Sequence, residues 1–402
     1  MNILFATLVD INSIEERGIY QDLVRELINL SHSVYIVSPA ERRYKKATEF
    51  FPSGSGGILK VRIGNIQKTN FVEKGIATVL LEQQFLRAVR KRLLHVKFDL
   101  ILYSTPPITL AKLVKYIKKR DDAVSYLLLK DIFPQNAIDL GLFSQNSLIH
   151  RAFRKKEREI YSISNHIGCM SRANADYLLS HDEFINPDKI HVNPNSITPR
   201  PLSDTVNRNA IREKYAIPID AKVFIYGGNL GKPQCVSFIV ECMKKHQDKD
   251  DSYFLICGDG TDAGILSDYI KEYSPRNVRL LKMLPKETYD DLLSACDIGL
   301  IFLDFRFTIP NFPSRLLSYM EQGLPVLACT DISTDIGKVI TTGEFGWWCE
   351  SNDPAEFTRV IDKICEYETD MLCEMGRHGR QYLEKNYLAE QSARIIVDST
   401  AK

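Results

Sequence analysis

The chain has 402 residues with 44% hydrophobic and 26% charged side chains, an ordinary globular composition, and it exceeds the ~250–300 residues of one hydrophobic core. No window approaches the ~18 consecutive apolar residues of a membrane span, and the start of the chain lacks the basic and small-residue segments of a signal peptide. The net charge of +1 conceals a basic first half, residues 1–200 with 29 Lys and Arg against 20 Asp and Glu, and an acidic second half with 23 against 31. Unless it is drift, this asymmetry indicates two domains that meet different partners.

Strand and helix signals alternate along the first half. Helical periodicity predicts helices at residues 18–30 and 109–119. Short apolar runs predict buried strands at residues 2–8, 34–37, 99–103, 124–129 and 166–170. Strands that alternate with helices indicate a parallel, doubly wound sheet.

A second α/β series follows a linker predicted at residues 193–207, which are rich in Pro, Asn and Ser. Helical patterns at residues 377–385 and 389–397 close the chain. The strands are predicted at residues 222–226, 253–257, 278–281, 298–302 and 326–328. We therefore expect two Rossmann-like domains, residues 1–195 and 196–385, with a helix at 386–402 packing back on the first. Ligands bind at the carboxyl ends of parallel strands, so the two domains are expected to face each other across a cleft.

The loop Tyr226-Gly227-Gly228-Asn229-Leu230-Gly231-Lys232 follows the first strand of the second series. Its glycines let backbone N–H groups approach an anion, and a helix beginning near Pro233 would add its positive end. Lys232 adds a full charge. The pattern predicts a phosphate site, and the alternative is a glycine-rich turn with a solvated lysine.

Two further segments are predicted to contribute to the same ligand site. Gly258-Asp259-Gly260 follows the next strand and predicts either a ligand loop or a plain strand–helix turn. In residues 310–325, Ser314 is expected to cap a helix, and free N–H groups at Ser314 and Arg315 would hold a diphosphate. Ser318 would meet a sugar hydroxyl, whereas the apolar stripe of this helix is expected in the core; it comprises Leu316, Leu317 and Met320.

The order of these motifs resembles glycosyltransferase family 4. The resemblance runs along essentially the whole chain and includes residues 104–107 (STPP), 130–135 (KDIFPQ), 194–195 (PN), 277–281 (NVRLL), 295–298 (ACDI) and 313–326 (PSRLLSYMEQGLPV). It implies the GT-B fold and a retaining, metal-independent hexosyltransferase. The loops at residues 131–134 and 228–232 look most like those of the subgroup that transfers N-acetylfucosamine-type sugars in O-antigen and capsule synthesis.

The resemblance also implies the partners and the site. The donor is expected to be a UDP-sugar, the acceptor a lipid-diphosphate-linked saccharide, and no cofactor is expected. The implied donor-binding residues are Gly18, Gly228, Asn229, Lys232, Gly258, Asp259, Gly260, Ser314, Arg315, Leu317 and Ser318.

The chain departs from the family at two positions. The family carries two glutamates eight positions apart, and Pro310 and Ser318 stand in their places. The second glutamate accepts hydrogen bonds from the donor ribose, which a serine can replace without charge. Proline offers no polar group near the donor sugar, so that contact is left open. Glu321 is expected on another face of the helix.

Two residues are expected to act in the chemistry. Asp131 ends a predicted strand, where it would steady positive charge on the sugar carbon or take the acceptor proton, unless it caps a helix. Retaining transfer without an obvious nucleophile suggests front-face displacement, in which the leaving diphosphate helps to accept that proton. Lys232 would then stabilise the diphosphate.

The histidines do not predict a metal site, whereas the basic residues predict a docking surface. The eight histidines show no ligand spacing, so we expect activity in the presence of a chelator. A basic amphipathic face predicts peripheral docking of a cytoplasmic protein on an anionic membrane, at the inner face of the plasma membrane. The alternative is that this face is a solvated helix face. Nucleic acid is not expected, because the basic clusters lack interleaved aromatic residues. The clusters comprise Arg87, Arg90, Lys91, Arg92 and Lys97, and Arg151, Arg154, Lys155, Lys156 and Arg158.

Two other functions remain open from the sequence. A GT-B sugar-nucleotide epimerase or hydrolase would need a constellation of acids and histidines that the motifs do not show. A catalytically silent nucleotide-sugar-binding subunit would fit the two missing glutamates.

Overall fold

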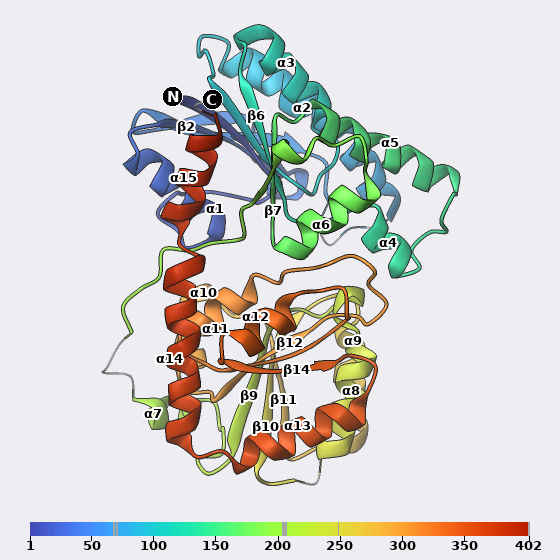
Figure 1. The fold of residues 1–402 in the computed structure, drawn as a ribbon, viewed down its shortest axis with the longest axis vertical. Coiled ribbons are helices and arrows are strands. Elements are labelled where there is room, and N and C mark those ends of the chain that lie inside the picture. The colour runs from blue at the N-terminus through green and yellow to red at the C-terminus, as the bar shows by residue number, and fades with distance from the viewer. Residues whose placement is uncertain (67–68, 70, 203–206, 248, 401–402) are drawn as a thin grey trace. The chain divides into compact units, whose positions relative to one another are not determined.

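The computed structural model describes residues 1–66, 69, 71–202, 207–247 and 249–400. The chain divides into two compact units (Figure 1). Unit 1 comprises Met1–Thr198 and Ala389–Lys402, and unit 2 comprises Pro199–Leu388. Residues 203–206 of the predicted linker lie outside the described residues.

Unit 1 is built on an eight-stranded sheet with the order β3-β4-β2-β1-β5-β6-β7-β8. The strands are β1 Asn2–Ala6, β2 Ser33–Glu41, β3 Glu49–Ser53, β4 Gly56–Ile63, β5 Leu100–Ser104, β6 Val124–Leu129, β7 His166–Cys169 and β8 Ile190–Val192. Every neighbouring pair is parallel except β3 and β4. Because a parallel sheet needs a crossover after each strand, helices cover both of its faces.

The helices of unit 1 form two layers (Figure 1). Helices α1 and α15 pack together over the apolar side chains of β1, β5 and β6. On the opposite face, α3 lies between α2 and α5 and contacts both. The helices are α1 Ile19–Asn29, α2 Phe71–Arg92, α3 Ala111–Asp121, α4 Gln135–Asp139, α5 Leu148–Ile163, α6 Arg172–His181 and α15 Ala389–Thr400.

Unit 2 is built on a six-stranded, wholly parallel sheet with the order β11-β10-β9-β12-β13-β14. Its strands are β9 Lys222–Asn229, β10 Ser252–Asp259, β11 Val278–Leu281, β12 Ile298–Phe302, β13 Val326–Thr330 and β14 Gly346–Glu350. Its helices are α7 Arg208–Lys214, α8 Val236–His246, α9 Ala263–Tyr273, α10 Lys286–Ser294, α11 Arg315–Glu321, α12 Ile336–Thr342, α13 Pro354–Glu366 and α14 Thr369–Asn386.

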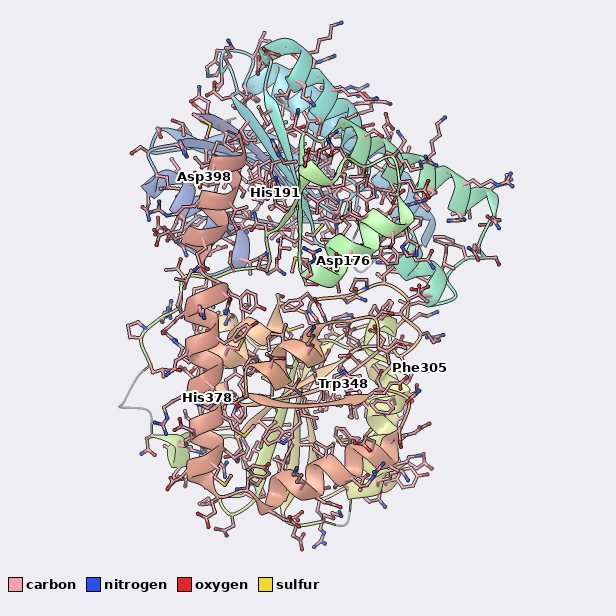
Figure 2. The ribbon with its side chains drawn as sticks, in the orientation of Figure 1. Asp176, His191, Phe305, Trp348, His378 and Asp398 are labelled. Carbon is pink, nitrogen blue, oxygen red and sulfur yellow. The ribbon has the colours of Figure 1, made fainter. Side chains whose placement is uncertain are left out.

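Both cores consist of strand side chains that meet the covering helices. In unit 2, Phe224, Phe254 and Phe302 of three neighbouring strands are fully buried against α8 and α13. Side chains also tie adjacent strands: the indole N–H of Trp348 on β14 (Figure 2) donates to the hydroxyl of Thr330 on β13 at 2.9 Å. Two doubly wound α/β domains, as predicted from the alternation of strands and helices, are confirmed.

Some local predictions are corrected. The antiparallel strand β3 was missed, because its mostly exposed side chains and Pro52 lack the apolar run of a buried strand. Strands β9 and β10 extend beyond residues 226 and 257, so three glycines that were predicted in loops lie within the strands: Gly227, Gly228 and Gly258. Helix α8 begins at Val236 instead of near Pro233.

Candidate functional site

The ends of β9 and β10 lie side by side and bring two predicted ligand segments together. In the parallel register Gly228 lies opposite Gly258, and Asn229 lies opposite Asp259. A side chain on Gly258 would collide with the carbonyl oxygen of Gly228. Only glycine therefore allows this close approach, which places backbone rather than side chains at the carboxyl edge of the sheet.

The turn after β9 is fixed by a residue that the sequence patterns missed. The side-chain oxygen of Gln234, which is largely buried, accepts hydrogen bonds from the Asn229 amide at 2.8 Å and from Gly231 N–H at 3.3 Å. Gly260 closes against the same turn, since a side chain there would collide with the Leu230 carbonyl oxygen. The Asn229 amide is thus used to hold the turn. No motif signals Gln234, because its role depends on a turn geometry that the sequence does not show.

Lys232 is exposed at the tip of this turn. It opens the 3-10 turn Lys232–Gln234, and Cys235, with a φ of 48°, separates that turn from α8. Among the described residues it forms no ion pair with an acidic side chain. Lys232 therefore presents an unpaired ammonium group on the turn that follows β9, whereas the N-terminus of α8 comes four residues later.

Arg315 is the second cation of this site. Its guanidinium lies 4.3 Å from the centre of the Tyr226 ring, and its Nη2 would be 3.2 Å from a Cβ on Gly228, whose φ is 134°. Its Nη1 is buried and has no hydrogen-bond partner among the described residues. A buried donor of this kind is costly unless an acceptor reaches it, and a bound anion would supply one.

The start of α11 supplies backbone donors, although not by the predicted cap. Ser314 is exposed and occupies the N-cap position, but its side chain makes no capping hydrogen bond, which corrects that prediction. The N–H groups of Ser314 and Arg315 donate to no described residue. Leu317 is buried and its N–H donates to the Ser314 carbonyl at 3.1 Å, so the structure gives this predicted donor-binding residue a place in the core.

The two positions that depart from the family pattern lie in this region. Pro310 is buried, and Ser318 is half-buried one turn into α11. Glu321 is also buried, and its carboxylate accepts a hydrogen bond from Arg200 N–H at 3.0 Å. Glu321 therefore anchors the segment before α7 and does not replace either missing glutamate.

Asp131 and Gly18 belong to unit 1. Asp131 follows β6 after one intervening residue, and the N-cap of α4 is Pro134, so Asp131 is not a helix cap. Burial raises the pKa of Asp131 to about 6 and lowers the pKa of the neighbouring Lys130 to about 7. Gly18 is the N-cap of α1, and a side chain there would meet only the flexible side chain of Gln21.

A buried tyrosine completes this part of unit 1. Burial raises the pKa of Tyr20 to about 12, a hydrogen bond with Ser104 opposes that rise, and the charge of Asp131 adds to it. The neutral hydroxyl of Tyr20 and the carboxyl of Asp131 therefore lie near one another at the carboxyl edge of this sheet.

The described residues also bear on metal binding and on membrane insertion. Within the described ranges, no group of three or more His, Cys, Asp and Glu side chains is arranged to hold a metal ion. None of the described helices is both long enough and apolar enough to cross a bilayer.

Comparison with known proteins agrees with the geometry of unit 2. The family model described as Glycosyl transferases group 1 matches residues 207–382. These residues lie within unit 2. The chain is 24% identical over 374 residues, 88% of each chain, to the probable glycosyltransferase WbjE of Pseudomonas aeruginosa. It is 23% identical over 137 residues, 33% of each chain, to the putative colanic acid biosynthesis glycosyl transferase WcaI of Escherichia coli K12.

Solved structures show the same fold along the whole chain. The structure of Anabaena Alr3699/HepE in complex with UDP matches with a TM-score of 0.68 and 12% identity over 100% of both chains. The apo structure of OtsA matches with a TM-score of 0.74 and 9% identity over 100% of this chain and 99% of that one. The fold is GT-B, as the sequence resemblance implied.

Proposed function

We propose that this protein is a retaining, metal-independent hexosyltransferase that moves a sugar from a UDP-sugar to a lipid-diphosphate-linked saccharide. The observation that carries the proposal is the arrangement around Gly228. At this strand end, where only glycine fits, the guanidinium of Arg315 lies against Gly228 and the N–H groups at the start of α11 are unused. Lys232 stands on the turn that follows the strand. Such a cradle suits a diphosphate.

The identity of the donor is inferred from relatives and from the resemblance. The UDP complex of HepE supports a uridine nucleotide. The resemblance to N-acetylfucosamine-type transferases supports an N-acetylated deoxyhexose. Ser318 would contact the donor with a hydroxyl in place of a carboxylate.

The proposed chemistry is a front-face displacement. The acceptor hydroxyl oxygen attacks the anomeric carbon from the side of the leaving group, and the bond from that carbon to the β-phosphate oxygen breaks. The acceptor proton passes to the departing diphosphate. Lys232 and Arg315 stabilise the charge that develops there, a role for which a metal ion is not needed. Asp131, ionised above pH 6, steadies positive charge on the sugar carbon.

The proposed acceptor and location are supported by one relative and by the resemblance. The name of the colanic acid biosynthesis glycosyl transferase WcaI, with the resemblance to transferases of O-antigen and capsule synthesis, supports a role in surface polysaccharide synthesis. A lipid-diphosphate-linked acceptor would be held in a bilayer, so we propose that the protein acts in the cytoplasm, at the inner face of the plasma membrane.

The decisive experiment has two stages. Mass spectrometry of nucleotide that co-purifies with the full chain is expected to find UDP or a UDP-sugar. A panel of UDP-sugars with a lipid-diphosphate acceptor, in buffer with EDTA, is then expected to give transfer with the donor's anomeric configuration kept, as read by NMR. An inverted product, or a requirement for added divalent cation, would contradict the mechanism.

A second function is favoured by one observation. Pro310 is buried and apolar where the family that the sequence resembles carries a glutamate, which suits a subunit that binds a nucleotide sugar without turning it over. UDP-sugar binding without transfer across the whole panel would favour that function. Conversion of the donor without any acceptor would instead favour an epimerase or a hydrolase.

A further inference from the structure

The positive charge of unit 1 is concentrated in three neighbouring helices. Helices α2, α3 and α5 together hold 15 Lys and Arg against 5 Asp and Glu, a net charge of +10. Residues 1–200 as a whole carry a net charge of +9. The excess positive charge of residues 1–200 is therefore accounted for by the helical layer that covers one face of the sheet (Figure 1).

The sequence predicted two separate basic clusters, and the fold joins them through a third element. Helix α3 lies between α2 and α5. It carries Lys112, Lys115 and Lys119, all exposed, at a spacing that places them on one side of the helix. Lys112 pairs with Glu82 of α2 at 3.7 Å, and Lys115 pairs with Glu159 of α5 at 2.7 Å. These pairs hold the three helices as one surface.

Much of the charge on this surface is not neutralised. Arg154 pairs with Glu157 and Asp182, and Lys156 pairs with Glu159. Eight other exposed cations form no ion pair with any described residue: Arg87, Arg90, Lys91, Arg92, Lys119, Arg151, Lys155 and Arg158. Like charges gathered on one face repel one another, and the phosphates of an anionic surface would relieve that repulsion.

Apolar side chains stand beside these cations. Leu148 and Ile149 in the first turn of α5 are 83% and 51% exposed, and Val79 of α2 is 72% exposed. On α5, Leu148 shares its helix side with Arg151 and Lys155, and on α2, Leu80 shares its side with Arg87 and Lys91. A basic helix face with protruding aliphatic residues fits an anionic lipid surface.

The exposed aliphatic residues of α5 lie at one edge of the sheet. Crossover helices of a parallel sheet run opposite to its strands, so their N-termini lie at the carboxyl edge. Leu148 and Ile149 lie in the first turn of α5, and therefore at the carboxyl edge, where β6 ends and Asp131 follows it. Val79 and Leu80 lie near the middle of α2. The lysines and arginines extend from there toward the opposite edge.

We propose that the outer face of α2, α3 and α5 is a docking surface for an anionic bilayer. The aliphatic side chains of α2 and α5 enter the headgroup region, and the unpaired lysines and arginines contact lipid phosphates. This inference rests on the proposed function only for its purpose, which is to bring unit 1 to a lipid-linked acceptor. The binding itself does not depend on catalysis.

Vesicle sedimentation tests the surface with the full chain. The protein is expected to bind phosphatidylcholine vesicles that contain phosphatidylglycerol, and to release as salt rises. It should not bind vesicles of phosphatidylcholine alone. Arg151→Glu with Lys155→Glu, and separately Leu148→Ser with Ile149→Ser, should each reduce binding by at least about tenfold. The matched controls in unit 2, Lys271→Glu and Met371→Ser, also change exposed side chains and should bind as wild type.

Several outcomes would overturn the proposal. They are no binding to anionic vesicles, equal losses in variants and controls, or binding to duplex DNA or RNA in place of vesicles. Circular dichroism checks that each variant is folded. Transfer to a short-chain, water-soluble acceptor separates the two hypotheses, because the docking variants should retain it. Vesicle binding without any transfer would leave the docking surface standing and reject the proposed function.

Discussion

The two cations near Gly228 are held in different ways. Lys232 is exposed on a short turn, and nothing in the described chain neutralises it. The guanidinium of Arg315 stacks on Tyr226 and keeps one buried nitrogen without an acceptor. The arginine, held against Tyr226, suits a role in binding the donor, whereas the exposed lysine suits stabilisation of the charge that appears only as the diphosphate leaves.

Replacement of Lys232 tests this distinction. Lys232→Ala is expected to lower kcat by about 10²–10³, the effect of removing one preorganised charge contact, with a smaller change in KM. Steady-state kinetics with saturating acceptor measures both constants. Lys271→Ala, another exposed lysine of unit 2, serves as the control. Turnover near that of wild type in Lys232→Ala would reject the assignment.

The raised pKa of Asp131 gives a prediction about pH. Its pKa in the fold, about 6, exceeds the ordinary 3.8, so the folded state holds a proton more tightly than the unfolded state. Stability from this residue is therefore present below pH 4 and is lost as pH rises through 6, by at most about 3 kcal/mol. Asp131→Asn should thus unfold at higher denaturant than wild type at pH 8, with little difference at pH 4.

The same substitution is expected to reduce transfer. Wild-type turnover should rise with pH through about 6 as the carboxylate ionises. Asp131→Asn should lose that limb of the profile. A variant that gains stability and keeps the full pH profile would show that Asp131 is buried for structure alone.

At the scale of elements, the contact between the ends of β9 and β10 sets the site. Gly258→Ala would force its new methyl group onto the Gly228 carbonyl and is expected to destabilise unit 2 by about 1–3 kcal/mol. It should also weaken UDP binding, measured by calorimetry. Gly264→Ala in α9 has open space around it and should be neutral or slightly stabilising. Equal behaviour of the two variants would contradict the close-approach argument.

The turn between β9 and α8 depends on Gln234. Gln234→Ala removes the acceptor for Asn229 and Gly231 and is expected to lower kcat about tenfold, because Lys232 loses its position. Gln234→Glu keeps an oxygen in the same place and should restore most of the activity. Loss in both variants with unchanged UDP affinity would point to a different role for this residue.

At the scale of the whole molecule, the C-terminal helix belongs to the fold of unit 1. Ala393 and Ile396 of α15 are fully buried in its core, and Ser392 donates to the Asn193 side chain at 2.6 Å. The last residues of the chain therefore complete the first unit, and the chain passes between the units twice.

This arrangement predicts that the two units respond separately to a mutation in α15. Ile396→Ala should destabilise unit 1 by about 2–5 kcal/mol and leave unit 2 unchanged. Unfolding followed by hydrogen exchange, resolved by peptide, should show faster exchange in α1 but not in α8. Arg394→Ala, an exposed position on the same helix, should have little effect. A uniform loss of protection in both units would contradict the prediction.

The sequence by itself determined the fold class and the segments of the donor site. Apolar runs and helical periods indicate which side chains are buried, and glycines before a lysine indicate that the backbone must approach a ligand closely. The predicted segments around Gly228, Gly258 and Arg315 do meet in unit 2. These signals are local, so they survive without knowledge of the fold.

Only the tertiary structure decided how residues far apart in the chain act together. Gln234 holds a turn and Ser314 fails to cap, because each outcome depends on which partner lies within about 3 Å. The two basic clusters became one surface because the sheet order places α3 between α2 and α5. Strand order is set by long-range pairing, which composition and periodicity do not encode.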